Sequence, residues 1–221
     1  QYTVTDLGNG KYQIQILKSG ANITAKDVSV EVAGAKGDFG TINADGTTGK
    51  MEVATSEELA DALASGKVTD ITLTADVELS SQVDWDVDGA TIDGKGNKIT
   101  MESGKLSVLG DDVTVKDVEF VSATGESAFQ VYNANGVVLE NVTATGDEAA
   151  VIINGSKVTM KDCKVANTDE NGWGGINVDK NGELTIEGTL DYTGVAATKP
   201  VIWAENTGNG VVNGFEAVGL T

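Results

Sequence analysis

The chain has 221 residues, with 15 Lys against 34 Asp plus Glu, and its formal charge is −19 at neutral pH. It contains no Arg and no His, which excludes a Ser-His-Asp triad, a His-ligated zinc site and an arginine clamp on phosphate. A surface this acidic also repels a phosphate backbone, so we expect no nucleic-acid partner.

The remaining composition indicates a folded, glycine-punctuated chain. Hydrophobic residues make up 40% and aromatic residues only 5%, so we expect an aliphatic core. The 28 Gly and single Pro favour many regular bends. Cys163 is the single cysteine, which rules out an internal disulfide, and no run reaches the roughly 18 apolar residues of a membrane helix. The sequence begins at Gln1 without a visible signal peptide, so we expect part of a larger multidomain chain.

Residues 1–50 predict an N-terminal β-segment. The stretch YTVTDLGNGKYQIQIL is typical of a hairpin around Asn9-Gly10, because Asn-Gly favours a tight turn. The stretch ITAKDVSVEV from Ile23 matches a strand pattern that recurs later, yet it precedes the only strong helix signal. Two arrangements remain open, a small separate β-domain or strands packed along the side of the main fold. We favour an attached β-segment.

Residues 55–65 predict a short amphipathic helix. Thr55 and Glu58 have the spacing of a capping box at its start. Leu59 and Leu63 share one face, and Gly66 is a suitable terminator.

After this helix one strand pattern recurs with a nearly constant period. The copies are VTVKDVEF at 113–120, VVLENVTA at 137–144, VTMKDCKV at 158–165, LTIEGTLD at 184–191 and, more loosely, GVVNGFEA at 210–217. Their steps are 24, 21, 26 and 26 residues. In each copy, two alternating apolar residues are followed by a one-residue shift of phase. The positions at the shift are Asp117, Asn141, Asp162, Gly188 and Gly214. Asp, Asn and Gly tolerate positive φ, so we expect each strand to bend there.

A second strand series keeps the same period. It reads LSVLG from 106, FQVYN from 129, VIING from 151, INVDK from 176 and VIWAE from 201, with steps of 23, 22, 25 and 25 residues. Alternation in the last copy places Val201 and Trp203 inside. Two series with one period predict a parallel β-helix, in which stacked turns share one core. Leucine-rich repeats would need a Leu/Asn signature, and a β-sandwich would not require like residues at one spacing.

From about Val53 the chain resembles the bacterial pectate-lyase-like right-handed parallel β-helix superfamily. The matching stretches are SEELADALASGKVTDITLTADVEL and TIDGKGNKIT. The resemblance implies an all-β, right-handed parallel β-helix over 51–221, closed at its N-terminal end by the helix at 55–65. It implies little about activity, because the superfamily includes lyases, hydrolases, tail-spike-like proteins and non-catalytic adhesins.

The sequence contains few of the catalytic residues that the enzymes of this superfamily use. Its lyases usually use an Arg base, which this chain lacks, and some use Lys; Lys157 and Lys180 are candidates, although a solvated surface lysine is the favoured interpretation of each. Asn167-Thr168-Asp169 matches the first motif of the polygalacturonases, but their other three motifs do not follow. We interpret this tripeptide as a turn and assign no catalytic residue.

Acidic loops make calcium a possible ligand. Asp84, Asp86 and Asp88 alternate along one strand, and Asp169 with Glu170 forms a second group of oxygen donors. The competing interpretation of the first group is a polar outer face over a buried Trp85. No other cofactor is expected.

Two aromatic residues are candidates for ligand binding. Tyr132 falls on the outward phase of its strand, and Trp173 lies in an Asn-Gly-Trp-Gly-Gly loop. Either could stack on a sugar ring, or could instead cover the edge of a turn.

These observations favour a non-catalytic extracellular or cell-surface β-helix module of bacterial type. It would act as an adhesin or rigid scaffold that binds a polysaccharide or another surface protein. The alternative is a polysaccharide-active enzyme, either a calcium-dependent lyase with a Lys base or a carboxylate-only glycoside hydrolase.

Overall fold

The computed structural model describes the backbone of residues 2–8, 11–16, 25–32, 35–42, 49–66, 68–194, 199–205 and 215–217. Side chains are described for 49–66, 68–194 and 199–205. Within these ranges the chain has one short helix, and its other regular elements are β-strands. The expected all-β class is therefore confirmed.

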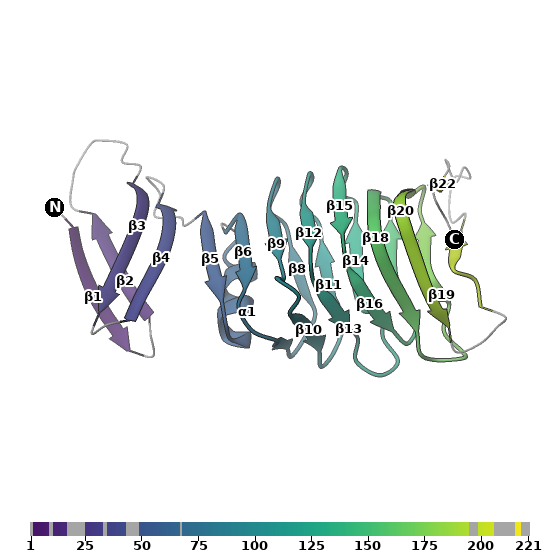
Figure 1. The fold of residues 1–221 in the computed structure, drawn as a ribbon, viewed down its shortest axis with the longest axis horizontal. Coiled ribbons are helices and arrows are strands. Elements are labelled where there is room, and N and C mark those ends of the chain that lie inside the picture. Colours follow the sequence, from purple (N-terminus) through teal and green to yellow (C-terminus); the bar gives the residue numbers. More distant parts are fainter. Residues whose placement is uncertain are drawn as a thin grey trace.

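Most strands stack in parallel along one long axis, as Figure 1 shows. A turn such as β9–β10–β11 contributes two strands to a twelve-stranded sheet and one to a six-stranded sheet. The twelve-stranded sheet contains β5 (Lys50–Val53), β6 (Asp70–Leu73), β7 (Val77–Leu79), β9 (Thr91–Asp93), β10 (Lys98–Met101), β12 (Thr114–Lys116), β13 (Glu119–Val121), β15 (Val137–Glu140), β16 (Thr143–Gly146), β18 (Lys157–Asn167), β20 (Glu183–Gly194) and β22 (Phe215–Ala217). The six-stranded sheet contains β8 (Val83–Trp85), β11 (Leu106–Val108), β14 (Phe129–Tyr132), β17 (Ala149–Asn154), β19 (Gly174–Asp179) and β21 (Ile202–Ala204). This is the parallel β-helix that the repeats predict.

The register confirms the predicted periods except in the last turn. In the six-stranded sheet Leu106 pairs with Phe129, Phe129 with Val151 and Val151 with Ile176, as the steps of 23, 22 and 25 residues require. The last step was predicted wrongly, because Ile176 pairs with Ile202 and not with Val201. A slip of one residue moves every side chain of a strand to the opposite face.

The last strand of the twelve-stranded sheet also differs from the prediction. Leu184 pairs with Phe215, five residues beyond the expected partner Gly210. Gly210 itself, like Gly214, lies outside the described residues. The three earlier steps of this series agree with the pairing of β12 with β15, β15 with β18 and β18 with β20.

The predicted bends are sharp turns with positive φ. The φ angles are +51° at Asp117, +52° at Asn141, +51° at Asp162 and +69° at Gly188. These turns stack, because the Asp117 amide donates to the Glu140 carbonyl and the Asn141 amide to the Lys161 carbonyl. The Asn141 side-chain amide also donates to Asp117 Oδ1 at 2.7 Å. Residue types that tolerate the left-handed conformation therefore set where each strand changes direction.

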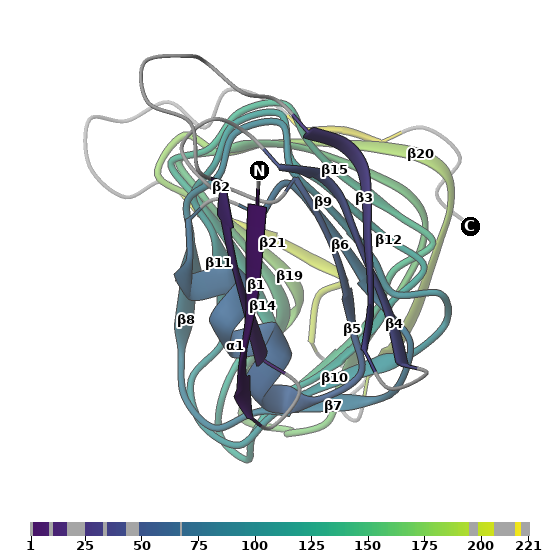
Figure 2. The same cartoon turned by 90° about the vertical axis from the view of Figure 1, so that its left-hand side faces the viewer.

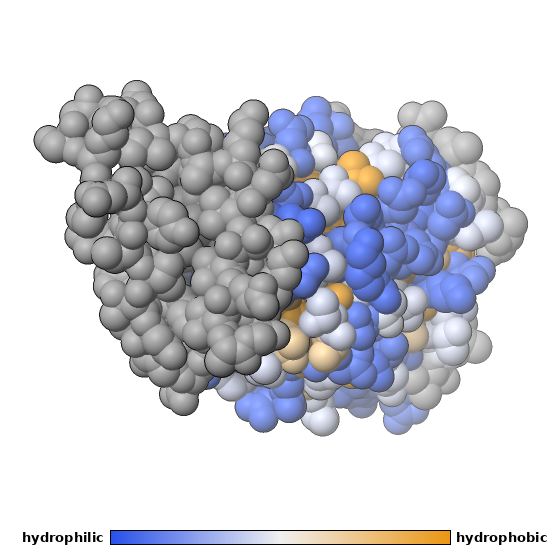
Figure 3. All heavy atoms as spheres, turned by 60° about the vertical axis from the view of Figure 1, so that its left-hand side comes forward, coloured by the Kyte–Doolittle hydropathy of each residue, from blue (hydrophilic) through white to orange (hydrophobic). Residues whose placement is uncertain are grey.

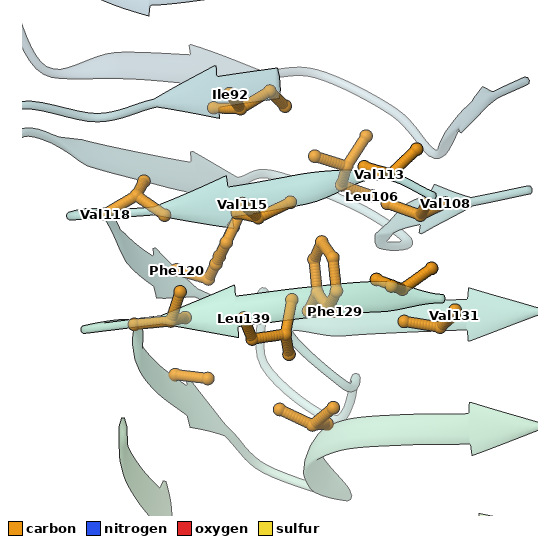
Figure 4. Packing of buried hydrophobic residues seen from close by; sticks show 14 of the residues in the cluster. Ile92, Leu106, Val108, Val113, Val115, Val118, Phe120, Phe129, Val131 and Leu139 are labelled. Carbon is orange, nitrogen blue, oxygen red and sulfur yellow. The ribbon is translucent and has the colours of Figure 1, made fainter. Parts of the chain in front are cut away.

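A continuous aliphatic core runs between the two sheets. The predicted inward residues of both strand series are buried through the first four turns of the repeat, and Figure 4 shows several of them facing one another. The aromatic contribution is small, and its main contact joins the rings of Phe120 and Phe129 at a centroid distance of 4.7 Å. Trp85 is also fully buried. Stacked turns thus bury a shared interior that no single turn could shield.

The helix α1 (Ser56–Ala64) covers the N-terminal end of this core. Thr55 and Glu58 form the predicted capping box, and Gly66 has a φ of +63° after the helix. Leu59 and Leu63 are buried, and the helix contacts β5, β7 and β8. Viewed along the axis in Figure 2, α1 lies across the end of the stack. Its buried leucines join the same apolar cluster as Val53 of the first turn.

The strands before residue 50 form two antiparallel pairs. β1 (Tyr2–Gly8) pairs with β2 (Lys11–Ile16), which confirms the predicted hairpin in its strands. β3 (Ala25–Val32) pairs with β4 (Ala35–Ile42). The repeat-like stretch from Ile23 therefore contributes an antiparallel strand and not a turn of the β-helix. An attached β-segment over residues 1–50 stays our prediction for this part.

Candidate binding surface

Trp173 lies exposed in the connection between β18 and β19. Its side chain is 40% exposed, in agreement with a loop position. The connection, residues 168–173, is called the Trp173 loop below. Asn167 at its start is buried and donates from Nδ2 to the Asp147 carbonyl at 2.7 Å, which supports the interpretation of Asn167-Thr168-Asp169 as a turn.

The Trp173 loop is fixed at several points to the preceding turn. The Thr168 amide donates to the Gly146 carbonyl at 3.0 Å, and the Trp173 amide to the Glu148 carbonyl at 2.5 Å. A Cβ atom on Gly172 would clash with the Asp147 carbonyl oxygen, so this close approach requires glycine. The loop therefore holds an exposed indole on a well-anchored backbone.

Asp147 links the same loop to a third turn. Its carboxylate accepts hydrogen bonds from the Thr168 hydroxyl and, at 2.6 Å, from the Gly125 amide. The Thr168 hydrogen bond, followed by that of Gly125, lowers the pKa of Asp147 below its ordinary value. The carboxylate is therefore charged at neutral pH and acts as a structural acceptor.

Tyr132 lies far from Trp173 on the same sheet. It is the last residue of β14, and its partner Asn154 pairs with Asp179, the last residue of β19. Trp173 instead precedes the first residue of β19, so the two aromatic residues stand at opposite ends of the strands. The Lys180 ammonium lies 5.3 Å from the centroid of the Tyr132 ring, in a cation–π contact. The structure thus does not bring the two predicted binding residues together.

Trp203 corrects the sequence prediction, which placed it in the core. Its side chain is 39% exposed, because the one-residue slip in β21 turns it outward. Trp203 pairs with Asn177, and Asn177 pairs with Ile152 on the next strand. Ile152 in turn pairs with Gln130, and Gln130 with Ser107. We call these five outward residues of neighbouring strands the central row. Alternation in the sequence predicted the inward face of the strand for Trp203, and this prediction was wrong.

Several of the carboxylates proposed for calcium accept hydrogen bonds from the protein. Asp84 Oδ1 accepts a hydrogen bond from the Gln82 side chain at 3.2 Å, and Asp88 Oδ1 one from the Asp111 amide at 2.9 Å. Asp169 Oδ1 accepts from the backbone and side chain of Asn171 within the Trp173 loop, next to Glu170. In the described ranges no three Asp, Glu, Cys or His side chains form a group that could hold a metal ion. Calcium binding at these residues stays a prediction.

The visible surface is largely hydrophilic. Figure 3 shows one face on which apolar areas are small and separate among the coloured residues. Trp173 and Trp203 are the exposed large hydrophobic side chains of the described part. The face in Figure 3 therefore offers no broad apolar patch for a partner.

A family model described as "Putative pectate lyase-like adhesive domain" matches residues 50–201. The chain belongs to this adhesive-domain family. The match runs from β5 through β20 and includes the capping helix, which confirms the resemblance to pectate-lyase-like proteins. No curated protein and no solved structure matches the chain. The described residues include no helix of the length and apolarity that crossing a membrane requires.

Proposed function

We propose that the chain is a non-catalytic adhesive module, located outside the cell or on its surface, that binds a glycan through exposed aromatic side chains. The observation that supports this most directly is the pair of exposed indoles, Trp173 at 40% and Trp203 at 39%. Indole rings supply a large apolar surface beside a polar group, a combination favoured in binding sites. The adhesive-domain family supports the coarser assignment to adhesion.

The scaffold suits recognition of an extended ligand. Neighbouring strands of the six-stranded sheet are in register, so their outward side chains recur at about 4.8 Å along the axis. The backbone that carries them is hydrogen-bonded from turn to turn, so little order has to be gained on binding.

The two candidate lysines offer little support for the enzyme alternative. Lys157 is 60% exposed at its side chain and lies 3.3 Å from a Glu183 carboxylate oxygen. Lys180 is engaged with Tyr132. A lysine base needs a dry environment that favours its neutral form, and neither contact provides one.

A glycan array probed with the full chain tests the proposal. We expect hits that are lost in at least one of Trp173→Ala, Trp203→Ala and Tyr132→Ala, while melting temperatures stay near that of the parent. An array without hits would contradict glycan binding.

A parallel absorbance assay tests the enzyme alternative. Pectate and alginate are incubated with the chain, with and without calcium, and unsaturated uronic products are followed. We expect no turnover. Turnover abolished by Lys157→Met or Lys180→Met would refute a non-catalytic role.

A further inference from the structure

A hollow of about 290 Å³ lies between the first turns of α1 and the corner where β7 leads into β8. The helix contacts both strands, as Figure 2 shows at the N-terminal end of the stack. The apolar lining of the hollow joins the main core and consists of Ala60, Leu79 and Val83. Hydrogen bonds fix the wall, because the Glu78 amide donates to Ser56 Oγ and the Glu102 amide to the Leu79 carbonyl, each at 2.8 Å. The backbone around the hollow is therefore well anchored.

The charged lining of the hollow is entirely negative. Three exposed glutamates, Glu57, Glu78 and Glu102, line it, and no lysine of the described chain does. Within the described residues, the carboxylates of Glu78 and Glu102 accept no hydrogen bond and form no ion pair. Elsewhere the structure does pair such groups, since the Glu140 carboxylate lies 2.8 Å from Lys161 Nζ. The hollow thus combines apolar surface with uncompensated negative charge.

This combination fits an ammonium group carried on an alkyl chain. A lysine side chain has an apolar four-carbon stem and a cationic head, so its two parts suit apolar and acidic surroundings. The stem would pack on Leu79 and Val83, and the ammonium would donate to the carboxylates and to the hydroxyls of Ser80 and Ser81. A metal ion fits less well, because no three acidic side chains in the described ranges are placed to hold one.

We infer that this hollow is a second binding site, which receives a lysine side chain of a protein partner. The site is separate from the proposed glycan contacts, because Tyr132, Trp173 and Trp203 do not line it. Membership of an adhesive-domain family agrees with a macromolecular partner. The formal charge of −19 would also speed the approach of a lysine-rich protein surface.

Binding is tested with short peptides that differ in one side chain. Each peptide has blocked ends and carries lysine, Nε-acetyllysine or norleucine at its centre, so that the charge and the apolar stem are varied separately. The peptides are titrated into the isotope-labelled full chain, and amide signals are followed by NMR. We expect saturable shifts around the hollow for the lysine peptide, and binding about fivefold weaker or more for the other two. High salt should weaken lysine binding severalfold, because exposed charges are screened.

Matched variants locate the site. Ala60→Leu fills the hollow and should weaken lysine binding about fivefold or more, whereas Ala64→Leu, at an exposed position one turn later on α1, should retain it. Glu78→Gln and Glu102→Gln should each weaken binding about twofold to fivefold, the range for an exposed ion pair. Asp191→Asn removes an exposed carboxylate on β20 and should leave binding unchanged. Melting temperatures serve as the folding control.

The outcomes decide the inference independently of the glycan array. Lysine-dependent shifts that weaken only in the Ala60, Glu78 and Glu102 variants would support the site. Absence of saturable shifts, or equal binding of the three peptides, would overturn it. Losses as large in Ala64→Leu and Asp191→Asn would also overturn it, because binding would then follow the overall charge of the chain. Glycan binding through the aromatic residues can stand or fail in each case.

Discussion

One outward row of the twelve-stranded sheet differs in charge from the central row of the six-stranded sheet, although the same turns of chain build both sheets. On the twelve-stranded sheet, five residues of neighbouring strands alternate in charge. This charge ladder consists of Asp93, Lys116, Glu140, Lys161 and Glu187. On the six-stranded sheet, the central row is uncharged.

In the charge ladder, the charged side chains are paired with other side chains of the protein. Lys161 Nζ lies 2.8 Å from Glu140 Oε1, and this hydrogen bond raises the pKa of Lys161. Burial opposes ionisation of Asp93, but hydrogen bonds from Lys95 and the charge of Lys116 outweigh it and lower the pKa of Asp93. Opposite charges on neighbouring strands stabilise each other. The residues of the charge ladder therefore stabilise one another, whereas the central row has no charges to pair.

The largest expected effect tests whether the two sheets are alike inside. Val118→Asp, Val142→Asp and Cys163→Asp bury an unpaired charge beside the twelve-stranded sheet, and Val131→Asp does so beside the six-stranded sheet. Each should destabilise the chain by about 4 kcal/mol or more, or prevent folding. Thermal unfolding followed by circular dichroism measures the loss.

The matched control for these variants is Thr159→Asp, at an outward position of β18 that pairs with Val138 and Thr185. It should change stability by less than about 1 kcal/mol. If the inward variants melt like the parent, the assigned register is wrong. If only Val131→Asp is mild, the sheets differ inside as well as outside.

Alkaline pH should lower the stability of the fold, because the Cys163 thiol is buried in the core beneath the twelve-stranded sheet. Burial raises the pKa of Cys163 from 9.0 to about 11. The native state therefore favours the thiol, so its contribution to stability is complete below about pH 9 and is lost as pH rises toward 11. The loss should be about 3 kcal/mol at most, because each pKa unit corresponds to about 1.4 kcal/mol.

The Cys163→Val variant isolates this effect. It keeps Lys161, whose ammonium also loses its proton at alkaline pH, so the difference between parent and variant reports the thiol. Urea unfolding at pH 8, 9, 10 and 11 should give free energies that fall more steeply for the parent. Equal slopes would mean that water reaches the sulfur.

The next effect concerns the bends that exist on both sheets. Asn141 after β15 and Asn133 after β14 both have a φ of +52°. Replacement by Ala should cost about 1–2 kcal/mol at each site, because a Cβ disfavours the left-handed conformation. Replacement by Gly should cost less, and urea unfolding measures both. If Ala and Gly variants are equally stable, backbone conformation does not explain why Asn occupies these bends.

The sequence was sufficient to predict the turns and the interior, because each feature recurs. Asp117, Asn141 and Asp162 share one type of bend, so one correct assignment supports the next. The prediction was wrong in the last turn, where VIWAE offers the adjacent aliphatic residues Val201 and Ile202. Either register places one of them inside, and no later turn in the sequence decides between them.

The one-residue error in the register of β21 also prevented the central row from being predicted. The exposure of Trp173 could be predicted from its loop, and the outward face of Tyr132 from alternation. Ser107, Gln130 and Asn177 are ordinary polar residues in the sequence. They become distinctive only when the strand register aligns them with Trp203.

The smallest expected effect compares the outer faces directly. Lys161→Met removes a central charge of the ladder and leaves Glu140 and Glu187 on either side without it. Exposed ion pairs contribute little, so we expect a loss of about 0.2–1 kcal/mol that shrinks in 1 M salt. Gln130→Met makes a similar change in size on the central row, where no internal partner is lost, and should alter stability by less and independently of salt. Both are measured by urea unfolding at low and high salt. A larger, salt-sensitive loss for Gln130→Met would show that the central row stabilises the fold, and the contrast between the faces would then disappear.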